Sequence, residues 1–317
     1  MAVFEYQDKQ YEFVMKLGAG AFGDTYQYKS GDKLFTIKIS TVYNSFTREV
    51  TALKALSSVC MSISIPCLRD TFTIRPNTDI YTKFDDLITV ISPKFHKSND
   101  SDSNGMYQYK VVIYDFINGV PFSKIVSGRG YNGTNTPSKN VVVSPLDVHL
   151  LISLGNQLLY TLSYMHEKGI AHRDIKPANI IWNPDSNKFT LIDFGAACTL
   201  NKCIGGMAGS PNYILPESLT NKKFESFEQS TISDIYALGT CMYCYITGTP
   251  PYEINVTRQP GSQVPNYQVM TDVDPFMTNT SSLSLIPEKY YLLLRDMILQ
   301  PNIYSNNTQV LYQLWTS

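Results

Sequence analysis

The amino-acid sequence predicts an α+β protein in which a β-rich first part is followed by a mainly α-helical second part. In the first hundred residues, short runs of β-type residues alternate with glycine-containing turns, which is typical of antiparallel strands. After Pro145, apolar residues recur instead at the spacing of long helices. The chain has 317 residues, of which 43% are hydrophobic, so it can bury a core in one large domain or two lobes.

The β-type runs cover residues 11–17, 24–28 and 34–40, and the turns between them cover residues 18–23 and 30–32. This order predicts an antiparallel meander with hairpin turns. A single helix is expected to follow, because apolar residues recur near helical spacing at Phe46, Val50, Leu53 and Leu56, with Glu49 on the neighbouring face.

The second part is predicted to contain long helices over residues 146–168, 232–247 and 288–299. The first of them carries an apolar stripe through Leu150, Leu151, Leu154, Leu158 and Leu162. Two polar segments, residues 97–105 and 127–140, are predicted to be surface insertions.

Composition excludes some classes of function. The net charge of -1 gives no general field that would favour nucleic acid or an anionic membrane, so neither partner is expected. No apolar run approaches the roughly 18 to 20 residues of a membrane span, and residues 1–13 are too polar for a signal peptide. We therefore expect a cytoplasmic or nuclear protein; the sequence leaves its oligomeric state open.

The cysteines show no paired zinc-ligand spacing with histidines; they are Cys60, Cys67, Cys198, Cys203, Cys241 and Cys244. In a reducing compartment they are expected to remain thiols. Cys241 and Cys244 lie within an apolar helical pattern, which favours buried structural thiols over a redox or metal-binding pair.

Two short motifs carry the chemistry. Residues 172–179 read His-Arg-Asp-Ile-Lys-Pro-Ala-Asn, and Asp193-Phe194-Gly195 begins nineteen residues after Asp174. They bring together two carboxylates and an amide, which suits phosphoryl transfer, because that reaction depends on positioning and on electrostatic stabilisation of the transferred group.

These motifs resemble the catalytic-loop and metal-loop signatures of eukaryotic-type Ser/Thr protein kinases. The resemblance implies a two-lobed protein-kinase-like fold with a small lobe at residues 1–114, a hinge at 115–118 and a large lobe at 119–317. It also implies ATP and a protein as substrates, with Mg²⁺ as cofactor and Mn²⁺ as an alternative.

The same resemblance assigns roles within the two motifs. Asp174 accepts the proton of the substrate hydroxyl, Lys176 approaches the γ-phosphate, and Asn179 and Asp193 hold Mg²⁺. Lys176, two residues after Asp174, is the type found in Ser/Thr kinases rather than tyrosine kinases. In the later helix, Asp234 is expected to brace the catalytic loop.

The glycine pattern Gly18-x-Gly20-x-x-Gly23 alone is ambiguous, because a dinucleotide-binding turn has the same spacing. A dinucleotide fingerprint opens a helix, whereas here a strand-like run follows and Lys38 comes fifteen residues after Gly23. The order favours a glycine-rich hairpin over phosphates, with Lys38 paired to the α- and β-phosphates and held by Glu49.

Residues 112–119 resemble the strand and hinge that hold adenine. In that register Tyr114 is a bulky gatekeeper, and backbone groups of Asp115 and Ile117 would bond the purine edge. Thr25 and Thr36 stand where the family usually has Val and Ala beside the adenine, so they are expected to crowd or polarise the pocket.

One departure concerns Glu217, because no arginine follows Pro301 to act as its buried partner. A buried, unpaired carboxylate would be costly, so either Glu217 is solvated or another base compensates. The altered pocket and the absent arginine leave open a pseudokinase that acts as a scaffold; a lipid or small-molecule kinase is a further alternative.

The segment from Asp193 to Glu217 offers few hydroxyls for an activating phosphate, although Arg173 is of the type that pairs with one. We expect a kinase that is active without phosphorylation of this segment, with the segment held by packing of Ile204 and Met207.

Overall fold

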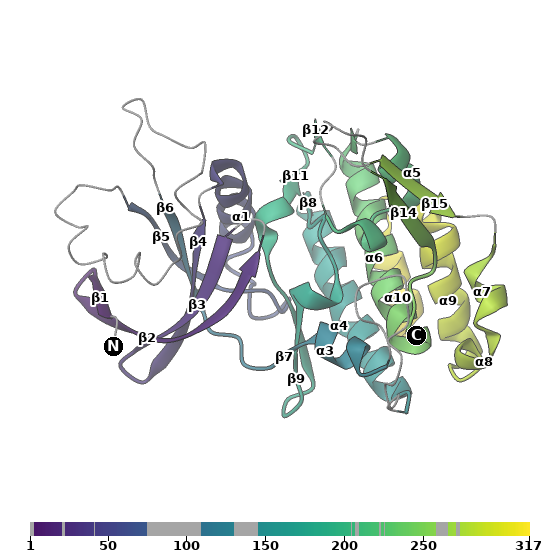
Figure 1. Ribbon diagram of the computed structural model, residues 1–317, viewed down its shortest axis with the longest axis horizontal. Coiled ribbons are helices and arrows are strands. Elements are labelled where there is room, and N and C mark those ends of the chain that lie inside the picture. Colours follow the sequence, from purple (N-terminus) through teal and green to yellow (C-terminus); the bar gives the residue numbers. More distant parts are fainter. Residues whose placement is uncertain are drawn as a thin grey trace. The chain divides into compact units, whose positions relative to one another are not determined.

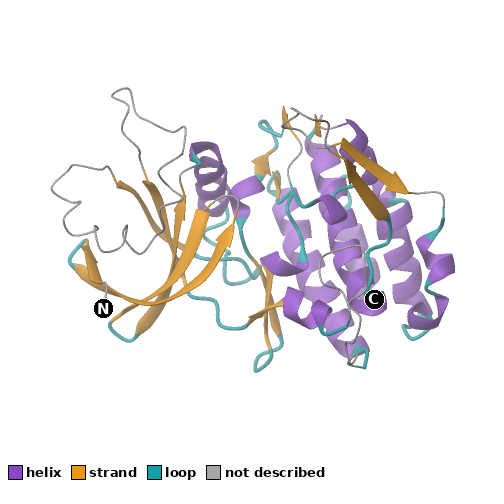
Figure 2. Ribbon diagram, in the orientation of Figure 1, coloured by secondary structure: helices purple, strands orange, loops and turns teal. Residues whose placement is uncertain are grey.

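The computed structural model (Figure 1) describes residues 3–20, 23–40, 42–74, 109–129, 145–203, 205–206, 209–221, 223–224, 226–257, 266–270 and 273–317. The chain divides into two compact units. Unit 1 comprises Met1–Met61 and Pro66–Ile117, and unit 2 comprises Ser62–Ile65 and Asn118–Ser317. Figure 2 shows that unit 1 is built mainly of strands and unit 2 mainly of helices, which confirms the predicted α+β class. Residues 62–65, predicted in the small lobe, group with unit 2.

Unit 1 is one antiparallel sheet with the strand order β1-β2-β3-β4-β6-β5. Its strands are β1 (Val3–Tyr6), β2 (Lys9–Gly20), β3 (Gly23–Ser30), β4 (Lys33–Ser40), β5 (Leu68–Ile74) and β6 (Tyr109–Asp115). The predicted meander holds from β2 to β4. It ends there, because β4 pairs with β6 and leaves β5 at the edge of the sheet.

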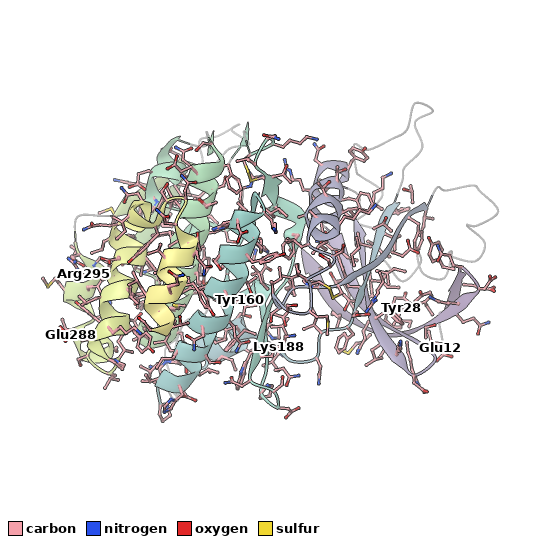
Figure 3. The ribbon with its side chains drawn as sticks, turned by 180° about the vertical axis from the view of Figure 1, so that it is seen from behind. Glu12, Tyr28, Tyr160, Lys188, Glu288 and Arg295 are labelled. Atoms are coloured by element: carbon pink, nitrogen blue, oxygen red, sulfur yellow. A yellow bond between two sulfur atoms is a disulfide. The ribbon has the colours of Figure 1, made fainter. Side chains whose placement is uncertain are left out.

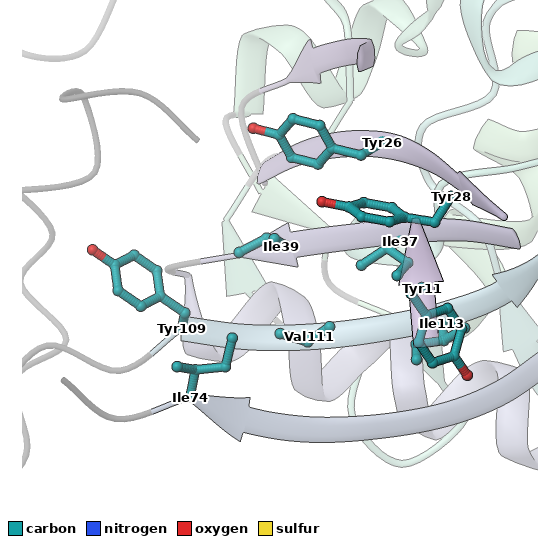
Figure 4. Packing of buried hydrophobic residues seen from close by; sticks show 9 residues of the cluster. All are labelled: Tyr11, Tyr26, Tyr28, Ile37, Ile39, Ile74, Tyr109, Val111 and Ile113. Atoms are coloured by element: carbon teal, nitrogen blue, oxygen red, sulfur yellow. The ribbon is translucent and has the colours of Figure 1, made fainter. Parts of the chain in front are cut away.

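One face of this sheet carries the core of unit 1 (Figure 4), formed by Tyr11, Tyr26, Tyr28, Ile37, Ile39, Ile74, Tyr109, Val111 and Ile113. Successive side chains of a strand point to opposite faces. The strand registers therefore place a second set on the other face: Thr25, Thr36, Lys38 and Tyr114. These four residues, all predicted to lie near a nucleotide, thus share one face of the sheet.

The predicted helix of unit 1 is α1 (Tyr43–Ala55). It packs against β4, β5 and β6, and its buried residues are Ser45, Glu49, Ala52 and Leu53. Glu49 is the ionisable residue in this otherwise small or apolar set, and it is only 3% exposed. A carboxylate buried to this extent needs hydrogen-bonding partners, which the sheet supplies.

Unit 2 contains the three predicted long helices as α4 (Val148–Glu167), α6 (Phe227–Thr247) and α9 (Glu288–Leu299). Asp147 caps α4 by accepting the N–H of Leu150 (3.0 Å), and Ser226 caps α6 by accepting the N–H of Gln229 (3.1 Å). Its shorter helices are α3 (Phe122–Ser127), α5 (Pro216–Asn221), α7 (Pro275–Thr278), α8 (Thr280–Leu283) and α10 (Thr308–Thr316).

Short strand pairs hold the loops of unit 2. They are β7 (Val120–Pro121), β9 (Ile180–Asn183) and β10 (Lys188–Leu191) in one sheet, β8 (Ile170–Ala171) with β11 (Cys198–Thr199), β12 (Gly205–Gly206) with β13 (Lys223–Phe224), and β14 (Glu253–Thr257) with β15 (Asn266–Met270). Short 3₁₀ turns cover Pro177–Asn179, Phe194–Ala196, Pro211–Tyr213 and Pro301–Tyr304. Within the described chain, no helix is long and apolar enough to cross a membrane. Residues 97–105 and most of 127–140 lie outside the described residues.

The expectation that all six cysteines are thiols is wrong for four of them. Disulfides join Cys60 to Cys67 in unit 1 and Cys198 to Cys203 in unit 2. The fold brings each pair to a Cα–Cα distance of 5.3 Å and 5.0 Å, respectively, which lies within the range for a disulfide. Cysteine spacing in the sequence could not reveal that proximity.

Cys241 and Cys244 are free and fully buried in α6, which confirms the prediction of structural thiols. Burial raises the pKa of both thiols well above the ordinary value. Because the thiolate is the reactive form, neither cysteine is suited to redox or metal chemistry at neutral pH.

The packing of α10 against α4 depends on a close approach of Trp315 to Gly155. A Cβ added at Gly155 would lie 2.2 Å from the Trp315 ring, which is fully buried and donates from Nε1 to the carbonyl of Ile152 (3.3 Å). We expect Trp315→Ala to lower the free energy of unfolding by about 3–5 kcal/mol, since it leaves a large cavity. Urea denaturation measures this, with exposed Leu314→Ala as the control; equal losses in the two variants would contradict the prediction.

Candidate active site

The catalytic loop lies between β8 and β9, and Asp234 of α6 fixes its backbone. The Asp234 side chain is fully buried and accepts the N–H groups of His172 and Arg173, both at 2.7 Å. The ring of His166 lies 3.0 Å from the same carboxylate. Arg173 has a φ of 65°, a left-handed conformation that is strained for a residue with a side chain. The predicted bracing by Asp234 is confirmed.

The Asp174 carboxylate is the centre of the loop. Its Oδ2 accepts from Lys176 Nζ (2.8 Å) and from Asn179 Nδ2 (3.0 Å), and its Oδ1 lies 3.3 Å from the hydroxyl of Ser210. Lys176 also donates to the Ser210 hydroxyl at 2.9 Å. Lys176 and Asn179, both predicted from this motif, thus contact the carboxylate of Asp174, which is only 5% exposed.

Ser210 was not among the predicted site residues. It lies 36 residues from Asp174 in the chain, in the segment from Asp193 to Glu217 that the sequence singled out only for its few hydroxyls. The sequence does contain a pattern that points to this residue: Gly209-Ser210 stands where the kinases that the motifs resemble usually have Gly-Thr. A hydroxyl at that position can bond both the acid and the lysine of the loop, so this signal could have identified it.

Asp193 is held beside Asn179 by the backbone. The N–H of Ile192 donates to the carbonyl of Asn179 (2.9 Å), and the His172 ring lies 3.0 Å from the carbonyl of Ile192. Asp193 itself has a φ of 65°, and its side chain caps the 3₁₀ turn through the N–H of Gly195. Two backbone conformations that cost energy are therefore kept at Arg173 and Asp193, as is common at functional sites.

The donor set at Asn179 and Asp193 fits a hard cation. The amide nitrogen of Asn179 is used by Asp174, so its Oδ1 is the atom that would bind a metal beside the Asp193 carboxylate. Among the described residues, no group of three or more His, Cys, Asp or Glu could hold a metal ion. A bound ion would therefore take further oxygen ligands from water or phosphate, as Mg²⁺ does.

In unit 1, the predicted ion pair of Lys38 and Glu49 is formed, with a distance of 2.8 Å between Nζ and Oε2. Both side chains are buried, at 7% and 4% exposed. The other carboxylate oxygen of Glu49 accepts the hydroxyl of Tyr114 at 2.6 Å. The pair is thus a three-membered group that joins β4, α1 and β6.

The glycine-rich hairpin joins β2 to β3. Gly23 has a φ of 146°, and an added Cβ would lie 2.3 Å from the carbonyl oxygen of Ile39, so the fold itself requires glycine there. Among the described residues, no atom outside the immediate chain neighbours lies within 4 Å of a Cβ added at Gly18, and at Gly20 the nearest lies at 3.7 Å. Packing against the described residues therefore does not account for these two glycines.

Comparison with protein families settles the family. The model described as "Protein kinase domain" matches residues 104–305, well over half of the chain. The chain belongs to the eukaryotic-type protein kinase family. The two-lobed kinase fold predicted from the motifs is thereby confirmed.

The chain is similar to several curated protein kinases over part of its length. It is 38% identical over 105 residues to "CBL-interacting protein kinase 21" of Oryza sativa subsp. japonica, covering 32% of this chain and 19% of that protein. It is 34% identical over 114 residues (35% and 21%) to "Calcium/calmodulin-dependent protein kinase kinase" of Caenorhabditis elegans. With the human "Hormonally up-regulated neu tumor-associated kinase" it shares 32% identity over 160 residues, 46% of this chain and 20% of that protein. The matched part is therefore about a fifth of each relative.

Asp115, in the predicted hinge, has defined partners. The Asp115 carboxylate forms a bidentate ion pair with Arg69, accepting from its Nε (2.6 Å) and its Nη2. These hydrogen bonds raise the pKa of the Arg69 guanidinium. The N–H of Asp115 donates to the carbonyl of Cys67 (3.3 Å). A bond from Asp115 to a purine would therefore use its carbonyl oxygen. The predicted roles of Ile117, Thr25 and Thr36 toward adenine stay predictions.

Glu217 is exposed, so the absent arginine leaves no buried carboxylate at this position. The fold therefore carries no cost of a buried carboxylate there. In the segment after Asp193, Ile204 and Met207 lie outside the described residues. Within the described residues, the segment is anchored by the Cys198–Cys203 disulfide and by Arg173, whose Nε donates to the carbonyl of Ala196 at 2.8 Å.

Proposed function

We propose that the chain is an active Ser/Thr protein kinase that transfers the γ-phosphoryl group of ATP to a protein hydroxyl, with Mg²⁺ as cofactor. The observation that carries the proposal is the buried Asp174 carboxylate, held by Lys176, Asn179 and Ser210. A pseudokinase has no need to keep this acid, its lysine and its amide in bonding contact.

The residues of the site have different proposed roles. Asp174 is placed to accept the proton of an attacking hydroxyl, and its bonds to Asn179 and Lys176 fix the orientation of the carboxylate. Lys176 supplies positive charge toward the transferred group, which becomes more negative as the reaction proceeds. Lys38, oriented by Glu49, is suited to bind the α- and β-phosphates.

Mg²⁺, when bound, would neutralise phosphate charge. We propose that Asn179 Oδ1 and the Asp193 carboxylate hold it, because both are hard oxygen donors on adjacent backbone. Gly18 and Gly20 fit the same substrate, since their open surface lets backbone N–H groups approach phosphate oxygens. A cytoplasmic or nuclear location stays a prediction.

The decisive experiment incubates the purified chain with radiolabelled ATP and separate protein, lipid and sugar acceptors. We expect label on serine and threonine of protein, loss of transfer with EDTA, and recovery with Mg²⁺ or Mn²⁺. Label only on a lipid or sugar would support a different kinase class. Binding of ATP without transfer to any acceptor would support the pseudokinase.

A further inference from the structure

The hydroxyl of Tyr114 makes a specific hydrogen bond, which a residue that only filled space would not need. Its ring lies at the end of β6 and is 5% exposed, and its hydroxyl donates to Glu49 Oε1 over 2.6 Å. That distance is in the range of a charge-assisted bond from a hydroxyl to a carboxylate. A buried tyrosine hydroxyl usually finds some acceptor, but here the acceptor is the residue that orients Lys38.

The two bonds of Glu49 come from different strands. Lys38 on β4 donates to Oε2, and Tyr114 on β6 donates to Oε1. With one donor, a carboxylate can rotate about the bond that joins it to the side chain; with two donors on different strands, its plane is fixed. The helix α1 begins without a side-chain cap, so these bonds from its buried face help to set where it lies on the sheet.

We propose that Tyr114 is a positioning residue for the phosphoryl transfer, which acts through Glu49 on Lys38. This rests on the proposed function, since Lys38 is assigned to the phosphates of ATP there. The hydroxyl holds Glu49, and with it α1, before nucleotide binds. Positioning by the Tyr114 hydroxyl needs no phosphorylation, unlike activation through a phosphate on the segment after Asp193.

The test is a double-mutant cycle of Tyr114→Phe and Glu49→Met. Phe keeps the ring and removes only the hydroxyl, while Met keeps the length of Glu49 and removes both acceptor oxygens. Tyr160→Phe is the matched control, because Tyr160 lies on α4 in unit 2 (Figure 3) and is 39% exposed. Two measurements are made: steady-state kinetics give kcat and KM for ATP, and urea denaturation without nucleotide gives the unfolding constant.

We expect Tyr114→Phe to lower kcat/KM about tenfold, mainly through a higher KM for ATP, and to raise the unfolding constant about tenfold. In the Glu49→Met background the same change should have less than a twofold effect on both quantities, because the acceptor is gone. Tyr160→Phe should leave kcat/KM unchanged. If Glu49→Met does not fold, Glu49→Gln replaces it, with an expected reduction of the coupling instead of its loss.

Equal effects of Tyr114→Phe in both backgrounds would overturn the inference, because the ring and not the bond would then matter. An undiminished kcat/KM in Tyr114→Phe, beside an inactive Lys38→Met variant, would overturn it as well. Failure of the proposed function looks different: the wild-type chain would transfer no phosphate, while the unfolding cycle without nucleotide would still show the coupling.

Discussion

Asp174→Asn is expected to reduce kcat by about three orders of magnitude without unfolding the chain, because it removes the proposed proton acceptor. The asparagine has the same size, and its oxygen can still accept from Lys176 or Asn179, so the packing of the loop is preserved. Lys38→Met and Asp193→Asn should show losses of similar scale, since each removes a charge that positions phosphate or metal. Initial rates of transfer measure the loss, and circular dichroism checks the fold.

Asp185→Asn is the matched control for this series. It makes the same chemical change at an exposed position in the turn between β9 and β10 and should leave kcat unchanged. Undiminished turnover in folded Asp174→Asn would remove the assignment of the proton acceptor. The same result in Asp193→Asn would remove the assignment of the metal ligand.

Asp234→Ala is expected to damage both stability and activity, because the catalytic loop depends on this one carboxylate. Its removal leaves the N–H groups of His172 and Arg173 without their acceptor in a fully buried place. Buried donors that lose their partner cost about 1–3 kcal/mol each, so the free energy of unfolding should fall by about 3 kcal/mol or more. Urea denaturation measures the stability, and transfer from ATP measures the activity.

The control is Asp296→Ala in α9, where the carboxylate accepts a bond from the Tyr304 hydroxyl at 3.2 Å and is only partly buried. We expect a loss of about 1 kcal/mol there, with activity retained. If the two variants lost the same stability, or if Asp234→Ala kept full activity, the loop would have another anchor.

The parts of the fold that the sequence predicted are those encoded by local patterns. The helices α4 and α9 follow from apolar spacing, and the hairpins from β2 to β4 follow from turn residues between β-type runs. Residues 172–179 form a continuous loop, so its acid, lysine and amide meet within a few residues. The bond of Lys38 to Glu49 crosses only eleven residues and two adjacent elements.

What the sequence did not predict depends on contacts between distant residues. Tyr114 and Glu49 are 65 residues apart, and Ser210 reaches Asp174 from a separate segment. The hairpin of β14 and β15 was also missed. It packs Ile254 against Ile214 and Leu219, an apolar contact between segments that are distant in the chain.

Because each of the two disulfides can be oxidised or reduced, the chain can exist in more than one covalent form. Each closes a short ring, with sequence separations of 7 and 5 residues, so each limits the unfolded chain more than the folded one. In the chain-entropy model a ring of this size is worth about 2 kcal/mol. Against a total stability of about 5–15 kcal/mol for a typical domain, full reduction would remove a sizeable share. The fraction of folded molecules therefore depends on the thiol–disulfide balance of the solution as well as on temperature and denaturant.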